Sequence, residues 1–435
     1  MNLTPTLHVG LMAAPEIAVT LHGEYADAAG RTRSGELTLS RADVGLTLTP
    51  RRPDATFTVR GMRIGIGYHW DSRRDLSFEG TLRVITEGHD EIRLVNDIDV
   101  ERYLCSVITS EMSADASGAL LRAHAVISRS WVMAQTLHRA AVRHDDELMG
   151  LREDADGDPE IIRWWDREDH EGFDVCADDH CQRYQGVTDA HRPEVEAAVA
   201  DTAGLVLTDP QGALVDARFS KCCGGVTEEF GTCWSPRESH ECLRAFGDNS
   251  SRRLPPLATE AEVRQWVTSR PAAFCAEATP ATMRQVLRDY DQSTRDFYRW
   301  VVEYSGDQLA AIVSDRLPEV AIGRIRELRP LERGASGRIS RLRIIGSEGS
   351  VTVGKELMVR RVLSPTHLYS SAFVVDHLEP DADRYPTRFV LRGAGWGHGV
   401  GLCQIGAAVM GERGYGWRDI LEHYFPGSFL SSCNG

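Results

Sequence analysis

The sequence predicts an α+β protein, because strand-like and helix-like patterns occupy different parts of the chain. In residues 1–95 apolar side chains fall on alternate positions, as at Leu76, Phe78, Leu82 and Val84, and this period is typical of half-buried strands. Residues 120–137 contain no Gly or Pro and are apolar on nearly every face, which predicts a buried helix. The length of 435 residues fits two or three domains.

Turn signals and patterns divide the rest of the chain. Residues 140–185 are polar and predict a loop, a short helix is expected from Pro193 to Gly204, and a hairpin is expected over 205–220. Strand-like alternation returns at 338–346 and 351–359, and a helical stripe precedes Pro426. We expect four segments: a β-rich N-terminal region at 1–95, the first part of an α/β core at 96–250, a helical insertion or subdomain at 251–320, and the second part of the core, with a Gly-rich loop, at 321–435.

Composition excludes some function classes. The 49 basic and 64 acidic residues give a net charge of −15, which disfavours nucleic-acid binding. No apolar run approaches the roughly 18–20 residues of a membrane span. No Lys or Arg precedes Arg31, so we expect no signal peptide in the printed sequence, and either an internal protein or an export signal absent from it. The ten cysteines of so large a chain favour reduced thiols over a disulfide framework, and leave room for a metal site.

The first motif is the acid at Glu111, just before the buried helix, and two interpretations are open. The helix dipole favours an acid in a first turn, so Glu111 can be structural. Alternatively, Glu111 is a general acid whose pKa is set by a partly buried pocket. Arg129, a charge in the buried helix, needs a partner, and could orient Glu111 or hold an anionic substrate group.

The second motif places His170, Cys176 and Cys181 within twelve residues, with His180 next to the last. Imidazole and thiolate are ligands that suit zinc. The spacing is not that of a standard zinc finger, and solvated loop residues are the alternative.

Two further motifs contain many glycines. Residues 392–404 place glycines around Trp396 and His398; glycines at this density allow a ligand or another strand to approach the backbone. Trp396 offers a flat face that suits a sugar ring, and His398 adds little packing, so we favour a functional loop in which His398 and Gln404 offer hydrogen bonds. The turn from Phe219 to Thr227, which contains Gly225, is typical of a structural strand end.

Together these motifs resemble the SpoIID/LytB family, named after stage II sporulation protein D. The resemblance runs from about residue 97 to 427. It rests on four stretches of this sequence: DIDVERYLCSVITSEMSADASGALLRAHAVISRSWVMAQ, the Cys181–Gln182–Arg183–Tyr184 run, the Phe219–Thr227 turn, and GAGWGHGVGLCQIGA with the following HYFPG. His124, Cys242, Cys403 and Ile405 stand where the family pattern has Gln, Tyr, Ser and Tyr.

The resemblance implies a peptidoglycan lytic transglycosylase that cleaves between N-acetylmuramic acid and N-acetylglucosamine and leaves 1,6-anhydro ends. It implies Glu111 and Arg129 as catalytic residues, and zinc bound by His170, Cys176 and Cys181, with His180 or water as a possible fourth ligand. We expect Gly225, Trp396, His398 and Gln404 to bind substrate in the same cleft as Glu111.

A single carboxylate is enough for this reaction, because the substrate's own C6 hydroxyl serves as nucleophile. We expect a dry pocket to raise the pKa of Glu111 toward neutrality, and Arg129 to contact substrate or another acid instead. The implied partners are glycan strands and a cell-wall amidase, and the implied location is the cell envelope, although the lack of a signal peptide also fits the cytoplasm. One alternative is a non-catalytic amidase enhancer. Another is a zinc hydrolase, which would keep an open position on the metal.

Overall fold

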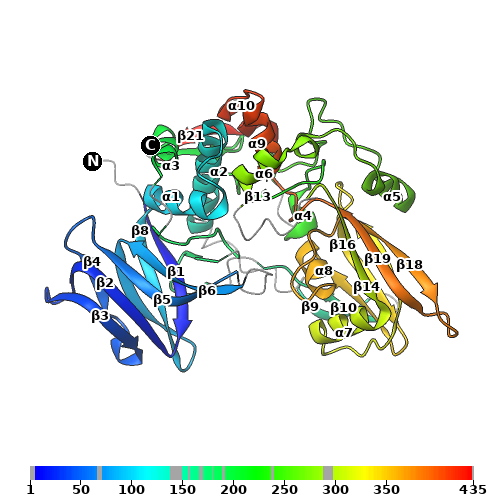
Figure 1. Cartoon of the computed structure of the whole chain (residues 1–435), viewed down its shortest axis with the longest axis horizontal. Helices are drawn as coiled ribbons and strands as arrows, with labels where there is room; N and C mark the ends of the chain where they lie inside the picture. Colours follow the sequence, from blue (N-terminus) through cyan, green and yellow to red (C-terminus); the bar gives the residue numbers. More distant parts are fainter. Residues whose placement is uncertain are drawn as a thin grey trace.

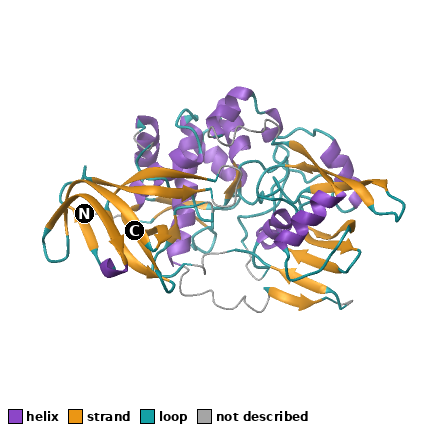
Figure 2. Cartoon of the chain, turned by 60° about the horizontal axis from the view of Figure 1, so that its bottom comes forward, coloured by secondary structure: helices purple, strands orange, loops and turns teal. Residues whose placement is uncertain are grey.

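The computed structural model describes residues 5–65, 71–137, 149–154, 157–165, 170–178, 180–188, 192–236, 240–287 and 297–433. It has the α+β class that the sequence predicts. In Figure 1 a large sheet from the N-terminal part lies on the left, smaller sheets from the C-terminal part lie on the right, and a group of helices lies above and between them. Figure 2 shows the same separation of strands and helices from a second direction. Within the described residues no helix is long and apolar enough to cross a membrane.

The N-terminal sheet is curled and has nine strands in the order β11-β1-β8-β7-β4-β2-β5-β6, with β3 beside β2. Its strands are β1 Thr6–Ala14, β2 Glu16–Ala26, β3 Thr32–Ser40, β4 Thr47–Pro50, β5 Thr56–Ile64, β6 Ser72–Glu79, β7 Thr81–Glu87, β8 Glu91–Asp99 and β11 Val175–Cys176. The predicted alternation is confirmed, because Leu76, Phe78, Leu82 and Val84 are at most 2% exposed. β11 pairs in parallel with β1, with Cys176 opposite Gly10, so the sheet edge holds one of the candidate metal ligands.

Three helices follow or cover this sheet: α1 Val100–Glu111, α2 Gly118–Leu137 and α3 Pro193–Asp201. Asp99 caps α1 by accepting the backbone N–H of Glu101 at 2.8 Å. α2 is the predicted buried helix. Glu111 is the last residue of α1, so its interpretation as a first-turn acid of the next helix is wrong. The C-terminal end of a helix dipole disfavours a carboxylate, and other groups must therefore hold this one.

The C-terminal part contains a five-stranded and a three-stranded sheet, ordered β15-β16-β17-β10-β9 and β14-β19-β18. Their strands are β9 Gly150–Glu153, β10 Pro159–Ile162, β14 Arg299–Ser305, β15 Ile325–Arg333, β16 Ile339–Gly346, β17 Ser350–Gly354, β18 Phe373–Pro380 and β19 Pro386–Ala394. β9 and β10 come from the stretch predicted as a loop, and β10 lies parallel to β17. The chain therefore passes from α2 into this sheet and returns to the N-terminal sheet at β11.

The segment predicted as a helical insertion, 251–320, contains the helices α5 Glu260–Thr268, α6 Pro280–Val286 and α7 Gly306–Arg316, and the short 3-10 helix η5 Phe274–Glu277. It also contains β14, which pairs with β19, so its helical character is only part of the description. The predicted strand at 351–359 is likewise half wrong, because β17 ends at Gly354 and helix α8 covers Glu356–Val362. The four segment boundaries stay predictions.

Two small ribbons bring distant parts of the chain together. β12 Leu205–Thr208 pairs with β21 Phe429–Ser432, and β13 Phe219–Ser220 pairs in parallel with β20 Leu402–Cys403. The hairpin predicted over 205–220 has its turn, but its second arm is not a strand beside β12. The remaining helices are α4 Phe230–Cys233, α9 Gln404–Glu412 and α10 Trp417–Tyr424. Side chains of α9 and α10 belong to the same apolar core as the N-terminal sheet and α2, whereas β15–β17 surround a second core.

Candidate active-site cleft and metal centre

A cavity of about 660 Å³ lies between the two cores, and both halves of the chain line it. Five of the nine tryptophans of the chain form part of its wall: Trp131, Trp164, Trp165, Trp234 and Trp396. Eight basic side chains line it against three acidic ones, although the chain carries a net charge of −15. Aromatic faces suit sugar rings, and the local excess of positive charge favours an anionic ligand.

Glu111 lies in this cleft and is 7% exposed. The Lys221 ammonium donates to the Glu111 carbonyl oxygen at 2.7 Å and lies 3.5 Å from Oε2, and the backbone N–H of Arg183 donates to Oε1 at 3.2 Å. Burial raises the pKa of Glu111, but the charges of Lys221 and Arg183 outweigh burial and hold the pKa below its ordinary value. The expected upward shift is therefore wrong for the free protein, in which Glu111 is an anion at neutral pH.

Gln404 and His124 form a buried pair beside this carboxylate. The amide nitrogen of Gln404 lies 3.1 Å from His124 Nε2, and His124 Nδ1 lies 3.1 Å from the Ser128 hydroxyl. Burial lowers the pKa of His124 to about 4, so its imidazole is neutral. Gln404 Oε1 is buried at the cleft wall without a hydrogen-bond partner among the described residues. A ligand that donates a hydrogen bond to Gln404 Oε1 would remove the free-energy cost of burying this oxygen without a partner.

The Gly-rich loop brings Trp396, His398 and Gln404 into the cleft together with Glu111. Its glycines let a neighbouring segment of the chain approach the backbone, which is one of the two expected uses of these glycines. Gly395 has φ +78°, and a Cβ there would lie 2.7 Å from the Cys222 carbonyl oxygen. One face of Trp396 is covered, because the Phe297 ring stacks on it at 4.6 Å with 9° between the planes.

His398 is positioned as a neutral hydrogen-bond donor. Its Nδ1 accepts the backbone N–H of Val400 at 3.0 Å, and its ring packs edge-on against Trp234 at 4.9 Å. Burial, together with the nearby charges of Arg218 and Arg338, holds the pKa of His398 well below its ordinary value. The remaining proton is then on Nε2.

Two predicted site residues lie elsewhere. Arg129 is fully buried, and its Nε donates to Glu101 at 2.9 Å while its guanidinium also donates to the Leu205 carbonyl at 3.0 Å. Arg129 is absent from the cleft lining and ties α1, α2 and β12 together. Its partner is another acid, which is one of the two expected contacts, and its catalytic role stays a prediction. Gly225 is also absent from the lining; at φ +103°, it faces the Tyr298 hydroxyl, 2.8 Å from where a Cβ would lie.

Glu356 is a cleft residue that sequence reasoning missed. It begins α8, is 1% exposed, and its Oε2 lies 3.4 Å from the Arg360 guanidinium. Its Oε1 is buried without a hydrogen-bond partner in the described part of the chain. A signal exists in the sequence, because an acid followed by basic residues within two turns is typical of a short helix, but the alternation at 351–359 favoured a strand.

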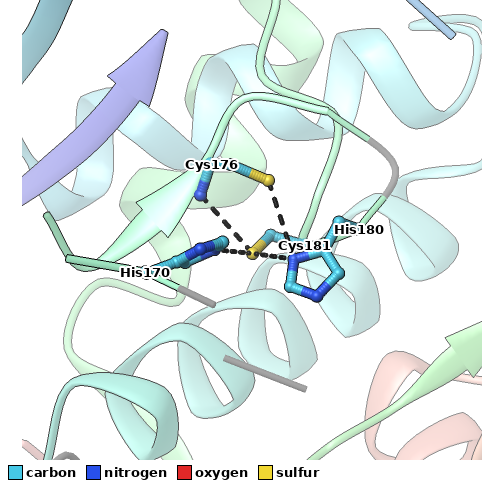
Figure 3. A group of neighbouring side chains, drawn as sticks. All are labelled: His170, Cys176, His180 and Cys181. Carbon is cyan, nitrogen blue, oxygen red and sulfur yellow. Dashed lines mark hydrogen bonds between the residues drawn. The ribbon is translucent and has the colours of Figure 1, made fainter. Parts of the chain in front are cut away.

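Four candidate metal ligands converge at the edge of the same cleft (Figure 3). The ligand atoms of His170, Cys176, His180 and Cys181 all lie within 4.8 Å of one another. The Cys181 sulfur lies 3.1 Å from His170 Nε2 and 3.6 Å from His180 Nδ1, which is 3.9 Å from the Cys176 sulfur. Zinc bonds of about 2.0–2.3 Å in a tetrahedron give ligand separations of about 3.3–3.8 Å. The three separations are close to these values, so the four side chains have the chemistry and approximate spacing of a tetrahedral zinc site, in which His180 would be the fourth ligand.

Two family models match the regions of the chain that line the cleft. Residues 88–208, which contain Glu111 and the four candidate metal ligands, match the family model described as Stage II sporulation protein. In this region the chain is similar to the SpoIID/LytB family. Residues 228–401, which contain Glu356, Trp396 and His398, match a domain of unknown function, DUF8618. Residues of both matched regions thus line the cleft.

Three relatives illustrate the range of the family match. The amidase enhancer of Bacillus subtilis (strain 168) is 23% identical over 246 residues, 54% of this chain, and the match spans only 32% of that longer protein. Stage II sporulation protein D of Bacillus amyloliquefaciens is 21% identical over 347 residues, covering 78% of this chain and 76% of that protein. An uncharacterized protein of Brachyspira hyodysenteriae (strain ATCC 49526 / WA1) is 21% identical over 359 residues, covering 82% and 73%.

Proposed function

We propose that this chain is a peptidoglycan lytic transglycosylase of the cell envelope, with Glu111 as its catalytic carboxylate. The observation that carries the proposal is the single cleft in which Glu111 lies with Trp396, His398 and Gln404. The aromatic wall suits the sugar rings of a glycan strand. The eight basic side chains suit the carboxylates of its lactyl groups and stem peptides.

Glu111 acts twice in the proposed reaction. As an acid it protonates the leaving glycosidic oxygen, and as a carboxylate it then removes the proton of the substrate's C6 hydroxyl, which closes the 1,6-anhydro ring. Because Glu111 is an anion in the free protein, it must take up a proton when the glycan binds. A bound glycan displaces water from the cleft, and this desolvation raises the pKa of the carboxylate.

We include one zinc ion in the proposal, bound by His170, Cys176, His180 and Cys181. Zinc binding supplies folding free energy and would hold the segment from His170 to Cys181 against the cleft. Four protein ligands leave no open position for a metal-bound water, which counts against the zinc-hydrolase alternative.

A non-catalytic role is the second candidate, as an amidase enhancer that binds glycan and acts through a cell-wall amidase. The observation that favours it is the lowered pKa of Glu111 beside Lys221. A general acid works best when its pKa lies near the working pH.

The deciding experiment is mass spectrometry of the products formed from purified glycan strands. We compare wild type, Glu111→Gln and, as a matched control, Glu356→Gln, which alters another buried carboxylate of the cleft. We expect 1,6-anhydro ends from wild type and Glu356→Gln, and none from Glu111→Gln. Bound but uncleaved glycan with all three proteins would support the enhancer. Reducing ends in place of anhydro ends would refute the transglycosylase.

A further inference from the structure

A second group of metal-binding side chains lies inside the protein, apart from the cleft lining. Cys223, Asp248, Cys275 and Cys403 are at most 3% exposed, and their ligand atoms lie within 4.8 Å of one another. They come from four places in the chain: the turn after β13, the loop before α5, the helix η5 and the N-cap of α9. Four segments that are distant in the sequence thus place metal-binding groups around one point.

The spacing is close to that around a single tetrahedral ion. The Cys223 sulfur lies 3.3 Å from Asp248 Oδ2 and 3.6 Å from the Cys275 sulfur. Zinc bonded to sulfur at about 2.3 Å and to oxygen at about 2.1 Å gives separations of about 3.6–3.8 Å. The Cys403 sulfur accepts the backbone N–H of Cys223 at 3.2 Å and that of Gly406 at 3.4 Å, which are contacts that favour a thiolate.

The charge of Asp248 calls for a cation. The carboxylate is fully buried and accepts the Tyr424 hydroxyl at 2.8 Å. Within the described residues its ion-pair partner is His423, at 3.3 Å, and no Lys or Arg is in range. A buried carboxylate without a cation is costly, whereas a divalent ion would balance it and deprotonate the neighbouring thiols.

Two ordinary explanations leave part of this arrangement unexplained. Buried cysteines can pack as small apolar residues, but apolar packing does not place a carboxylate among them. A disulfide between Cys223 and Cys275 would use two of the sulfurs and leave Asp248 and Cys403 as they are.

We propose that Cys223, Asp248, Cys275 and Cys403 bind a second metal ion, a structural divalent ion of the zinc class. Four protein ligands buried from solvent make a closed site, as structural zinc requires. The ion would stabilise one wall of the cleft from behind. Cys403 directly precedes Gln404, and Cys222, next to Cys223, exchanges two backbone hydrogen bonds with Trp396, at 2.7 and 3.0 Å. This centre is independent of the proposed reaction.

Metal counting tests the inference on the 435-residue chain, expressed with zinc and purified without chelator. The double variant His170→Ala/Cys176→Ser removes the cleft-edge site, and we expect it to retain one zinc per chain. Adding Asp248→Asn or Cys403→Ser should remove that zinc, whereas adding Cys105→Ser, a buried cysteine outside both clusters, should not. A double variant without metal, or one whose metal survives both Asp248→Asn and Cys403→Ser, would overturn the proposal.

Two further measurements on the double variant do not depend on how the additional variants fold. After replacement of zinc by cobalt(II), we expect the near-ultraviolet absorption of thiolate-bound cobalt. Alkylation after denaturation with chelator, without reductant, should modify every remaining cysteine. A Cys223–Cys275 disulfide, or iron–sulfur absorption from the isolated protein, would contradict a zinc-class site.

Discussion

His124 should make the protein sensitive to mild acid, and the effect can be calculated from its environment. Burial, together with the nearby Lys221 charge, lowers the pKa of His124 from 6.5 to about 4, while the Glu111 charge offsets part of this. The His124 imidazole therefore binds a proton near pH 6.5 in the unfolded chain, but only near pH 4 in the folded protein. Stability from the neutral imidazole is complete above pH 6.5 and is lost as the pH falls toward 4. The loss between pH 7.5 and pH 5 is about 2 kcal/mol.

The assay compares wild type with His124→Gln, which retains a hydrogen-bonding side chain beside Gln404 but does not titrate. Free energies of unfolding are measured in urea at pH 7.5 and pH 5, with zinc present. Wild type should lose about 2 kcal/mol more than the variant over this interval. The candidate metal ligands titrate in both proteins, so their contribution cancels in the comparison. Equal losses in the two proteins would show that His124 is not buried as a neutral group.

Two other predictions concern the Gly-rich loop and the acid. Gly401→Ala should lower the free energy of unfolding by about 1–3 kcal/mol more than the control variant Gly414→Ala. Both glycines have positive φ, so the backbone strain is similar in the two variants. A Cβ at position 401 would overlap the Arg218 carbonyl oxygen, whereas a Cβ at position 414 would face open space. Equal losses in urea unfolding would contradict this. Lys221→Met should raise the pKa of Glu111. The pH above which glycan cleavage is lost should therefore rise by about 1–3 units in this variant. A pH–rate profile identical to that of wild type would contradict this prediction.

Local patterns predicted much of the fold and part of the site. The helix at 120–137 was predictable because a helix that is apolar on nearly every face has few alternatives to burial. The short spacing of His170, Cys176 and Cys181 in the sequence predicted that these side chains lie close together, and the intervening turn does bring them together.

The errors arose where distant residues decide the outcome. The pKa of Glu111 depends on Lys221, which lies 110 residues away, so no local pattern could give its direction. Glu356 was missed because the apolar residues at 351, 353, 357 and 359 fall on alternate positions. This is the period of a strand, so the sequence did not indicate where α8 begins. The partner of Arg129 is Glu101, and nothing in the spacing of the two residues distinguishes an ion pair from a substrate contact.

The passage of the chain between the two sheets has a consequence for dissection of the protein. β9 and β10 belong by sequence to the region that matches the Stage II sporulation protein model, but β10 hydrogen-bonds to β17, which lies outside that region. A fragment cut to 88–208 would expose the β10 backbone that β17 covers and would also lack β1, the partner of β11. Unpaired strand edges promote aggregation. The region that matches the family model therefore does not correspond to an independently folding domain. Soluble fragments should be sought only among those that retain both sheets.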